Sequence, residues 1–205
     1  MRTYLNLFNK LCSEENLNLA YQKARKGKSS KSYVNLFESN LELNIKQLKK
    51  ELEEQTYKPK KLKKFIIRDP KTRTIHASAF RDRVVHHAVV NILQPIYEKV
   101  FIYDSFASRK GKGSHEAVTR FETFLRRVSD NGRRIKQGFD SNSIQGYVLK
   151  ADIKKYFDNM DHNVLIKILE KKIKDNDLVS LVRVILESFG EKGVPLGNYT
   201  SQFFA

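Results

Sequence analysis

The hydrophobic residues of this chain repeat at a helical spacing over most of its length, and this pattern constrains the fold more than any other feature. From Tyr33 to Glu54, for example, they recur every three or four residues, as on the buried face of an amphipathic helix. Further helical patterns cover residues 13–25, 80–93, 114–128, 161–173 and 178–189, and another begins near Asn198. Pro95 is expected to start a short continuation, to Phe101, of the helix predicted for residues 80–93. A helix-rich fold follows.

Two short segments carry a β-type pattern instead. Residues 62–77 hold two β-branched runs around Asp69-Pro70-Lys71-Thr72, a composition that favours a tight turn, and they are predicted to form a hairpin. Residues 147–152 are predicted to form a strand that ends in the carboxylate of Asp152. The polar stretch between 129 and 146, with two glycines before its end, is predicted to be a surface loop. Helices with separate strands indicate the α+β class.

The charge of the chain favours a polyanionic partner. Its 205 residues carry a formal net charge of +16, and 13 basic against 5 acidic residues lie between positions 46 and 83. Such an excess of cations points first to nucleic acid, although a solvated basic surface is the alternative. With 40% hydrophobic residues, the chain has enough apolar surface for a folded core.

Composition also excludes several classes of protein. A single cysteine, Cys12, rules out an internal disulfide framework and a cysteine-based zinc finger. No apolar stretch approaches the ~18 residues of a membrane span, and no signal peptide is recognisable at the N-terminus. We therefore expect a cytoplasmic protein with no membrane partner.

Asp152 is the first candidate for chemistry. A carboxylate at the end of a strand, beside an exposed backbone carbonyl such as that of Ile153, can bind a hard divalent cation such as magnesium. Taken alone, an aspartate here is better explained as a cap or turn residue. The same holds for Arg68 and Arg73 as cations of a solvated strand face, and for Phe157 as a core aromatic.

Five blocks in a fixed order give these residues a context. The segment Val148–Asp158 resembles the first catalytic motif of reverse transcriptases, and Arg68–Ile75 resembles the basic fingers hairpin of that family. Three further blocks match in the family's order: Phe80–His86, Ser105–Val118 and Gly193–Gln202. The likeness runs from about residue 60 to the end of the chain, and the order of the blocks makes it more specific than any one of them.

The resemblance implies a right-hand polymerase fold, with helix-rich fingers that include a β-hairpin and with an incomplete palm sheet. Residues 1–60 would form a helical N-terminal region, residues 61–145 the fingers, and residues 146–205 part of the palm. The paired aspartates that complete the family's metal site are absent before Ala205 and are expected in a hairpin beyond it. The 205 residues are therefore expected to be an N-terminal fragment that does not polymerise alone.

The resemblance also implies roles for single residues. Asp152 would be the catalytic, metal-bridging carboxylate, and the Ile153 carbonyl would help hold one of two magnesium ions that clamp the reacting oxygens. Arg68 and Arg73 would grip the phosphates of the incoming nucleotide, since guanidinium groups bind phosphate bidentately. Phe157 would exclude a ribose 2′-hydroxyl. The expected nucleic-acid contacts are Lys63, Lys64, Arg81, Arg83, Arg109 and Lys110. Asp82, early in a helix, is expected to be part of the scaffold.

Two positions narrow the family. Most reverse transcriptases carry glutamine immediately before the glycine that corresponds to Gly197, and proline after the serine that corresponds to Ser201; here these are Leu196 and Gln202. This pattern resembles the reverse transcriptases of diversity-generating retroelements, which copy a template RNA into cDNA with frequent errors at adenines. Leu196 and Gly197 are thus expected at the nucleotide site. The implied partners are template RNA, a cDNA primer, deoxynucleoside triphosphates and an accessory RNA-binding protein.

Other readings remain open on the sequence alone. A group II intron reverse transcriptase and an abortive-infection reverse transcriptase are close rivals, and Leu196 and Gln202 speak against the first of them. A catalytically silent RNA-binding module would need the charge but not the register of Asp152, Arg73 and Phe157. A basic helical scaffold protein would explain the composition but not the ordered blocks.

Overall fold

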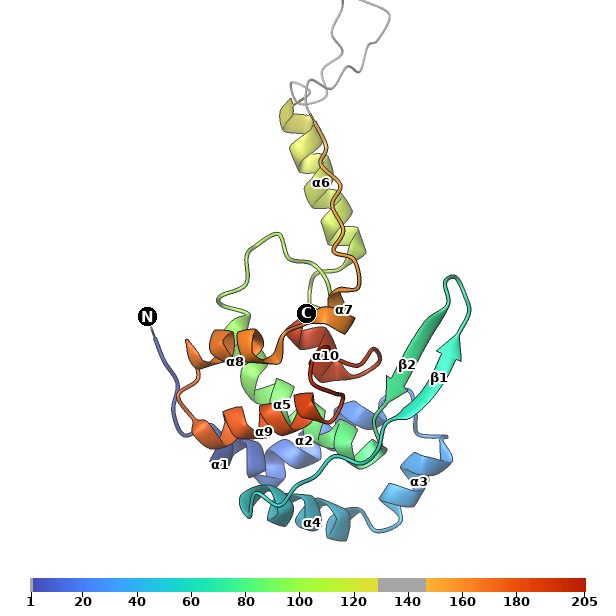
Figure 1. Ribbon diagram of the computed structural model, residues 1–205, viewed down its shortest axis with the longest axis vertical. Helices are drawn as coiled ribbons and strands as arrows, with labels where there is room; N and C mark the ends of the chain where they lie inside the picture. The colour runs from blue at the N-terminus through green and yellow to red at the C-terminus, as the bar shows by residue number, and fades with distance from the viewer. Residues whose placement is uncertain (1, 129–146) are drawn as a thin grey trace, which may run out of the picture. The chain divides into compact units, whose positions relative to one another are not determined.

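The structure of the chain, a computed structural model, describes residues 2–128 and 147–205. These residues form mainly helices, together with one two-stranded antiparallel sheet (Figure 1). They divide into two compact units: the first combines the chain up to Lys99 with residues 155–205, and the second runs from Val100 to Lys154. The predicted combination of many helices with a small hairpin is confirmed, whereas the right-hand polymerase fold and the boundaries between fingers and palm stay predictions.

The first unit contains all but one of the described helices and strands. Before the sheet come α1 (Phe8–Cys12), α2 (Glu14–Arg25), α3 (Ser32–Glu38) and α4 (Leu41–Glu53). The sheet follows with β1 (Lys63–Ile67) and β2 (Arg73–Ala77), and then comes α5 (Phe80–Tyr97). The C-terminal stretch adds α7 (Tyr156–Asn159), α8 (His162–Glu170), α9 (Asn176–Glu187) and α10 (Tyr199–Phe204). In the second unit, α6 spans Ser114–Val128.

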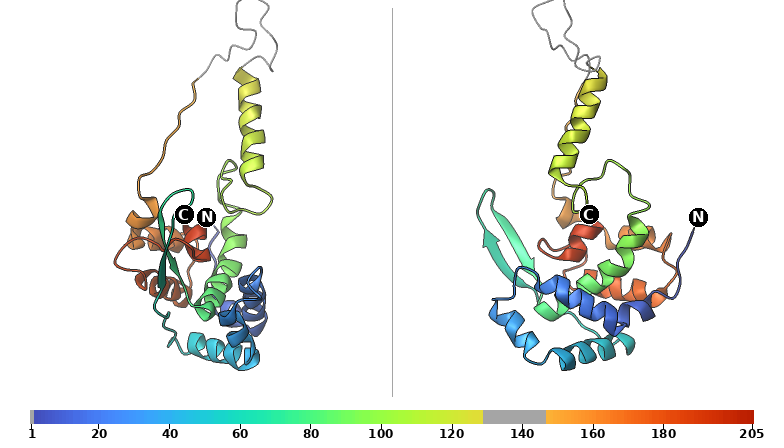
Figure 2. Two further views of the ribbon diagram at one scale, coloured as in Figure 1. Left: turned by 90° about the vertical axis from the view of Figure 1, so that its right-hand side faces the viewer. Right: turned by 180° about the vertical axis from the view of Figure 1, so that it is seen from behind.

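Helix α5 is the centre of the first unit. It contacts α1, α2, α3 and α10, and Figure 2 shows it between the helices of the first sixty residues and those of the C-terminal stretch. Its buried apolar residues include Val84, Val85, Val89 and Leu93, each at most 1% exposed. Because these residues lie on several sides of the helix, partners from both ends of the chain can pack on it. None of the described helices is long and apolar enough to cross a bilayer.

The start of α2 follows the prediction closely. The hydroxyl of Ser13 accepts a hydrogen bond from the backbone N–H of Asn16 at 3.2 Å, which satisfies one of the free donors at a helix N-terminus. Glu14 and Glu15 add negative charge to the first turn, where the helix dipole favours it. After Arg25 the chain turns at Gly27, which has a φ of +70°, as expected for a glycine that ends a helix.

The single helix predicted from Tyr33 to Glu54 is two helices, α3 and α4, separated at Ser39 and Asn40. The hydroxyl of Ser39 donates to the carbonyl of Leu36, and the amide of Asn44 donates to the carbonyl of Phe37. Such polar side chains compete for backbone hydrogen bonds and interrupt a helix. The continuation predicted from Pro95 to Phe101 is part of α5 itself, which runs through Pro95 without interruption and ends at Tyr97, with Ile96 and Tyr97 buried.

Hydrogen bonds join the N-terminal residues of the first unit to the loop between α8 and α9. The carboxylate of Asp175 accepts hydrogen bonds from the backbone N–H groups of Leu7 at 2.6 Å and Phe8 at 2.9 Å. Its other oxygen accepts from Leu178 at 3.1 Å, so that one side chain caps both α1 and α9. Tyr4 forms an isolated parallel bridge with Ile173 nearby. These contacts bring the start of α1 and the loop between α8 and α9 together.

The remaining helices deviate little from expectation. Asp161 caps α8 by accepting from the N–H of Val164 at 2.9 Å, and this helix ends at Glu170 rather than at Ile173. Helix α9 begins and ends two residues before the predicted positions. Helix α6 covers the predicted range. The loop predicted for residues 129–146 lies outside the described residues.

The strand predicted for residues 147–152 is wrong, because the structure assigns no regular secondary structure to them. Tyr147, Val148 and Leu149 are exposed by 69% or more. A strand requires the backbone of a neighbouring strand, and no described segment pairs with this one. The short apolar run Tyr147–Leu149 that favoured a strand is therefore insufficient without such a partner.

Candidate nucleic-acid interface

The hairpin β1–β2 carries the two arginines predicted to bind nucleotide phosphates. Arg68 directly follows β1, and Arg73 opens β2 opposite Ile67 in the antiparallel register. Both arginines are exposed, and no described carboxylate forms an ion pair with either. Guanidinium groups without a protein partner keep their full capacity for phosphate oxygens. The hairpin therefore presents two cations close to its turn, as the sequence predicted.

The base of β2 contacts the segment that holds Leu196 and Gly197. The backbone N–H of His76 donates to the carbonyl of Leu196 at 3.1 Å. A Cβ atom on Gly197 would lie 2.8 Å from Cγ2 of Ile75, and its φ is +106°. Only glycine meets both conditions without strain, because a side chain would collide with β2 and would disfavour this backbone conformation. Two blocks about 120 residues apart thus share one contact.

Asn198 strengthens this contact from inside the protein. Its side-chain oxygen accepts hydrogen bonds from the backbone N–H of Ser78 at 3.2 Å and from the hydroxyl of Ser78 at 2.7 Å. Both residues are buried, where hydrogen bonds are worth more than at the surface. Sequence reasoning did not assign a role to either residue, although Asn198 lies within the block Gly193–Gln202 and Ser78 lies between two other blocks.

The backbone of Phe157 is hydrogen-bonded to the same C-terminal segment. Its backbone carbonyl accepts from the N–H of Val194 at 2.8 Å, and the N–H of Gly193 donates to Met160 at 2.8 Å. A Cβ atom on Gly193 would lie 2.8 Å from the carbonyl oxygen of Asp158, so glycine permits this close approach. The ring of Phe157 is half-buried. The structure thus connects Phe157 through residues 193–197 to β2.

Asp152 and Ile153, the predicted metal ligands, belong to the second unit and are exposed. Their position opposite the hairpin arginines stays a prediction. In the chain as described, no three carboxylate, histidine or cysteine side chains gather into a metal-ligating group. Asp152 supplies one carboxylate oxygen donor of the kind that magnesium prefers, and a complete site needs further ligands from other residues.

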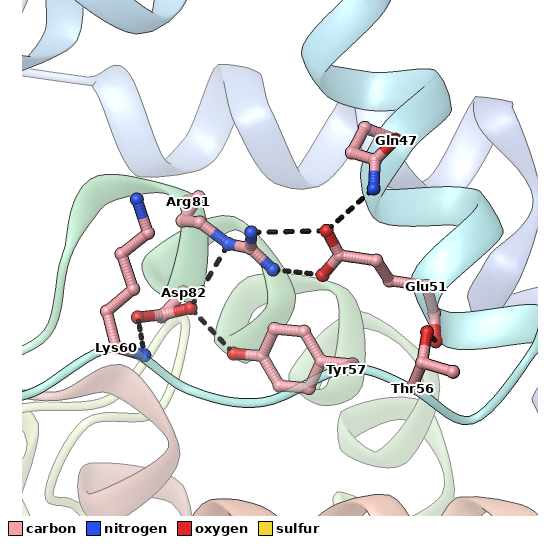
Figure 3. Close-up of polar contacts among 7 residues, drawn as sticks. All are labelled: Gln47, Glu51, Thr56, Tyr57, Lys60, Arg81 and Asp82. Carbon is pink, nitrogen blue, oxygen red and sulfur yellow. Dashed lines mark hydrogen bonds and ion pairs between the residues drawn. The ribbon is translucent and has the colours of Figure 1, made fainter.

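Arg81 and Asp82 form a buried polar network with the chain segment after α4 (Figure 3). Asp82 is fully buried, and its carboxylate accepts from the hydroxyl of Tyr57 and from the backbone N–H of Lys60, both at 2.9 Å. Arg81 pairs with Asp82 at 3.5 Å and with the carboxylate of Glu51. Burial raises the pKa of Asp82. This environment agrees with the scaffold role expected for Asp82.

Arg83, the other arginine of this block, is held on the opposite side. Its guanidinium donates to the carbonyl of Ser78 at 3.0 Å and to the hydroxyl of Tyr33 at 3.3 Å. It also lies 5.2 Å above the ring of Tyr33, within range of a cation–π interaction. Arg81 and Arg83 are therefore fixed by the protein and only partly exposed, and their predicted contact with nucleic acid remains a prediction.

A groove of about 890 Å³ lies between α3, α4, β1 and the start of α5. Its aromatic lining comprises Tyr33, Phe37, Phe65 and Phe80. Its cationic lining comprises Lys60, Lys61, Lys63, Arg81 and Arg83. Aromatic rings beside cations are the combination that single-stranded nucleic acids require for base stacking and phosphate contact. Lys60 and Lys61 were not singled out from the sequence, although the charge excess of residues 46–83 includes them.

Arg109 organises a loop of the second unit. It donates to the carbonyls of Ile102 at 3.1 Å and Ser105 at 2.9 Å, and it lies 5.3 Å above the ring of Phe101. Its guanidinium is therefore engaged in holding the loop, whereas the neighbouring Lys110 is exposed. Whether either contacts nucleic acid stays a prediction.

The adjacent histidines of α5 are packing groups. His86 is buried, and burial lowers its pKa to about 3, with smaller effects of His87 and Arg83 in the same direction. Burial also lowers the pKa of His87 to about 4, and its ring stacks on Tyr199 at 4.4 Å. Both are thus neutral near pH 7 and contribute no positive charge to the interface.

No protein-family model matches the chain. Among curated proteins it is similar to the group II intron-encoded protein LtrA of Lactococcus lactis subsp. cremoris, with 29% identity over 176 residues. That alignment covers 83% of this chain and 26% of LtrA. Protein YkfC of Escherichia coli (strain K12) is 24% identical over 81% of this chain and 43% of its own length.

The mitochondrial nuclear intron maturase 1 of Arabidopsis thaliana is 29% identical over 56% of this chain and 14% of the maturase. The chain thus spans about a quarter of the length of LtrA and less of the maturase. LtrA is by its description a group II intron-encoded protein, and the Arabidopsis relative is an intron maturase. The chain is thus similar, at 29% identity, to part of an intron-encoded protein and part of an intron maturase.

Proposed function

We propose that this chain is the fingers and first palm segment of an RNA-directed DNA polymerase, of the error-prone type found in diversity-generating retroelements. In this proposal the complete protein copies an RNA template into cDNA from deoxynucleoside triphosphates, and an accessory RNA-binding protein assists it. In this proposal the 205 residues alone do not polymerise, because they lack the paired aspartates that the family's metal site requires.

One observation carries the proposal furthest: the contact between the hairpin and residues 196–197. The hydrogen bond from His76 to Leu196 and the close approach of Gly197 to Ile75 join the block of the nucleotide-binding arginines to the block predicted to border the nucleotide. A basic scaffold protein requires charge but has no need for this pairing of distant blocks. The groove at the base of the same hairpin adds a cationic and aromatic surface for the template.

The residues divide into groups that bind, orient and select. Arg68 and Arg73 bind the triphosphate, and the ring of Phe157 selects deoxyribose by excluding a 2′-hydroxyl. Asp152 and the carbonyl of Ile153 would hold magnesium together with carboxylates from outside these residues. The metal would supply charge stabilisation for the attacking and leaving oxygens of nucleotidyl transfer.

Primer extension tests the polymerase. The full-length product of the gene that encodes these residues is incubated with an RNA template, a DNA primer, deoxynucleotides and magnesium. We expect extension that Asp152→Asn abolishes and that Arg73→Gln slows at least about tenfold, since each removes a charge from the transition state. Extension by the Asp152→Asn protein at the original rate would reject the assigned catalytic residue, and no extension by the unaltered protein would favour a non-catalytic RNA-binding module.

An intron-encoded reverse transcriptase or maturase is the second candidate, and the similarity to LtrA and the intron maturase favours it. Leu196 separates the two candidates. Leucine at this position can only pack, whereas glutamine can hydrogen-bond; the absence of one polar interaction lowers selectivity by about tenfold. We therefore expect Leu196→Gln in the complete protein to reduce misincorporation opposite template adenine. An unchanged error spectrum would favour the intron-encoded type.

A further inference from the structure

The segment between α4 and β1 has no regular secondary structure but follows a fixed path. It runs from Glu54 to Leu62 and carries lysines at positions 58, 60 and 61. Its first part is held to the end of α4, where the backbone N–H groups of Thr56 and Tyr57 donate to the carbonyl of Glu51 at 2.9 and 3.0 Å. We call residues 54–62 the lysine linker.

A single buried carboxylate holds the middle of the lysine linker. One oxygen of Asp82 accepts from the hydroxyl of Tyr57, and the other accepts from the backbone N–H of Lys60 (Figure 3). Tyr57 is 4% exposed, whereas Lys58 and Lys60 on its C-terminal side are exposed, so the linker enters the protein interior only at Tyr57. Both ends of this four-residue turn are thus fixed to the first turn of α5.

Arg81 compensates the charge of Asp82 and connects it to α4. Its guanidinium pairs with Asp82 and with both carboxylate oxygens of Glu51, which also accepts from Gln47 at 3.0 Å. Arg81 lies 5.5 Å above the ring of Tyr57. The carboxylate that fixes the lysine linker is therefore itself fixed by a neighbouring side chain.

A buried ion-pair network such as this one adds little net stability to the folded protein. Removing a carboxylate from water costs several kcal/mol, and a well-packed apolar group of similar size is often as stabilising as a buried ion pair. Hydrogen bonds, however, have direction, and these determine one backbone path for the linker. The side chains that this path presents include Lys60 and Lys61, which line the groove together with Arg81.

We propose that Asp82 and Tyr57 are positioning residues that hold the lysine linker so that Lys60 and Lys61 face RNA phosphates along the groove. This inference rests on the proposed function, because it requires that the groove binds RNA. Lysines on a fixed backbone lose less conformational freedom on binding than lysines on a mobile segment. The network thus increases RNA affinity without contacting RNA.

Tyr57→Phe is the sharpest test, because it removes one hydroxyl and keeps the buried ring. Tyr21→Phe is the matched control: the hydroxyl of Tyr21 donates to the carboxylate of Glu38 at 2.7 Å, and its ring is also buried. Both variants lose one tyrosine–carboxylate hydrogen bond, but Glu38 holds no part of the lysine linker. Denaturant unfolding of the two variants of the 205-residue chain is measured first, and RNA affinities are compared under conditions in which both variants are folded.

RNA affinity is then measured with a labelled single-stranded RNA at several salt concentrations. We expect Tyr57→Phe to weaken binding by about fivefold and to reduce the salt dependence by ~0.7 for each phosphate that a lysine no longer neutralises. Tyr21→Phe should leave both quantities unchanged. In a Lys60→Gln/Lys61→Gln background, Tyr57→Phe should have no further effect, because it acts through these lysines.

Equal RNA affinities of Tyr57→Phe and Tyr21→Phe would overturn the positioning role, as would an unchanged effect of Tyr57→Phe in the background that lacks both lysines. Either result would leave the proposed function intact, since the unaltered chain would still bind RNA. If the unaltered chain shows no salt-dependent RNA binding, the proposed function fails at its RNA-binding step and the positioning role fails with it.

Discussion

Helices α5 and α6 are both long and were both predicted from the sequence, but they differ completely in burial. Helix α5 buries eleven of its 18 residues, whereas α6 buries none of its 15. The separation of apolar from polar residues is nevertheless sharper in α6 than in α5. An amphipathic pattern therefore predicts a helix and its apolar face, but the amount of burial depends on the partners that reach it.

The difference follows from how the apolar residues are distributed. Helix α5 has apolar residues on several sides, so helices from both ends of the chain pack on it. In α6 the apolar residues form one stripe, in which Phe121 is 46% exposed. Arg120 lies 4.5 Å above the ring of Phe124 and pairs with Asp104 at 2.7 Å. A cationic side chain thus covers part of the α6 stripe, as arginine stems often do.

The largest expected effect tests this contrast directly. Leu93→Ala in α5 removes a side chain that is 1% exposed and should lower the free energy of unfolding by about 3 kcal/mol, from reduced burial and a cavity. Phe121→Ala in α6 should cost less than about 1 kcal/mol, because its ring is already half in water. Urea unfolding of the two variants measures both values. Equal losses would mean that the apolar face of α6 is covered in solution.

The same contrast predicts a pH effect. Burial lowers the pKa of His86 in α5 to about 3 from an ordinary value of 6.5. Between these values the unfolded chain binds more protons than the folded protein, so the free energy of unfolding falls as the pH drops below about 6.5. Each pH unit changes the free energy of unfolding by up to ~1.4 kcal/mol per titrating group, so His86 should lower it by about 2 kcal/mol between pH 6.5 and 5.

Replacement of single histidines identifies the source of this pH effect. His86→Gln should reduce the fall in stability between pH 6.5 and 5, measured by urea unfolding at half-unit intervals, and the remaining fall should come from His87, whose pKa burial lowers to about 4. His115→Gln, at an exposed position of α6, should leave the profile of the unaltered protein in place. A profile that His86→Gln leaves unchanged would mean that His86 is accessible to protons in the folded state.

Local signals in the sequence predicted local structure well. The cap at Ser13, the turn at Asp69-Pro70 and the range of α6 are confirmed because each depends on nearby residues. The helix expected across Ser39 and Asn40 failed because side-chain hydrogen bonds to the backbone outweighed the hydrophobic period. The strand at residues 147–152 failed for a different reason, since strands depend on partners that a single segment does not specify.

The candidate site was predictable to a similar extent. The ordered blocks indicated that residues near 73 and 196 act together, and the contact between His76 and Leu196 agrees with this. The groove and the role of Asp82 in holding Lys60 were not predictable, because they arise where α3, α4 and α5 meet. The periodicity or spacing within one segment does not indicate which other segments pack against it.

Removal of the Asp175 carboxylate should have the next largest effect on the free energy of unfolding. Asp175 caps α1 and α9 at once, so Asp175→Ala leaves donors of two helices without a partner and should cost about 2 kcal/mol. Asp161→Ala, which removes the cap of α8 alone, should cost about 1 kcal/mol. The difference between the two unfolding free energies measures how much the packing around α5 depends on joining the chain ends. Equal costs would show that α1 does not need this cap.

The smallest expected difference in unfolding free energy is between alanine variants of one glycine in each unit. Gly197 and Gly111 have φ values of +106° and +72°, so alanine is strained at both, but only at Gly197 would a Cβ atom meet another residue, 2.8 Å from Ile75. Gly111→Ala should cost about 1 kcal/mol from backbone strain. Gly197→Ala should cost about 0.5 kcal/mol more, because the β-branched side chain of Ile75 has few other rotamers. Urea unfolding gives the difference, and amide exchange at His76 gives its cause: the exchange should accelerate in Gly197→Ala alone. If both variants lost the same stability and His76 stayed protected, Ile75 would have moved aside, and the contact between the hairpin and the C-terminal segment would tolerate an extra methyl group.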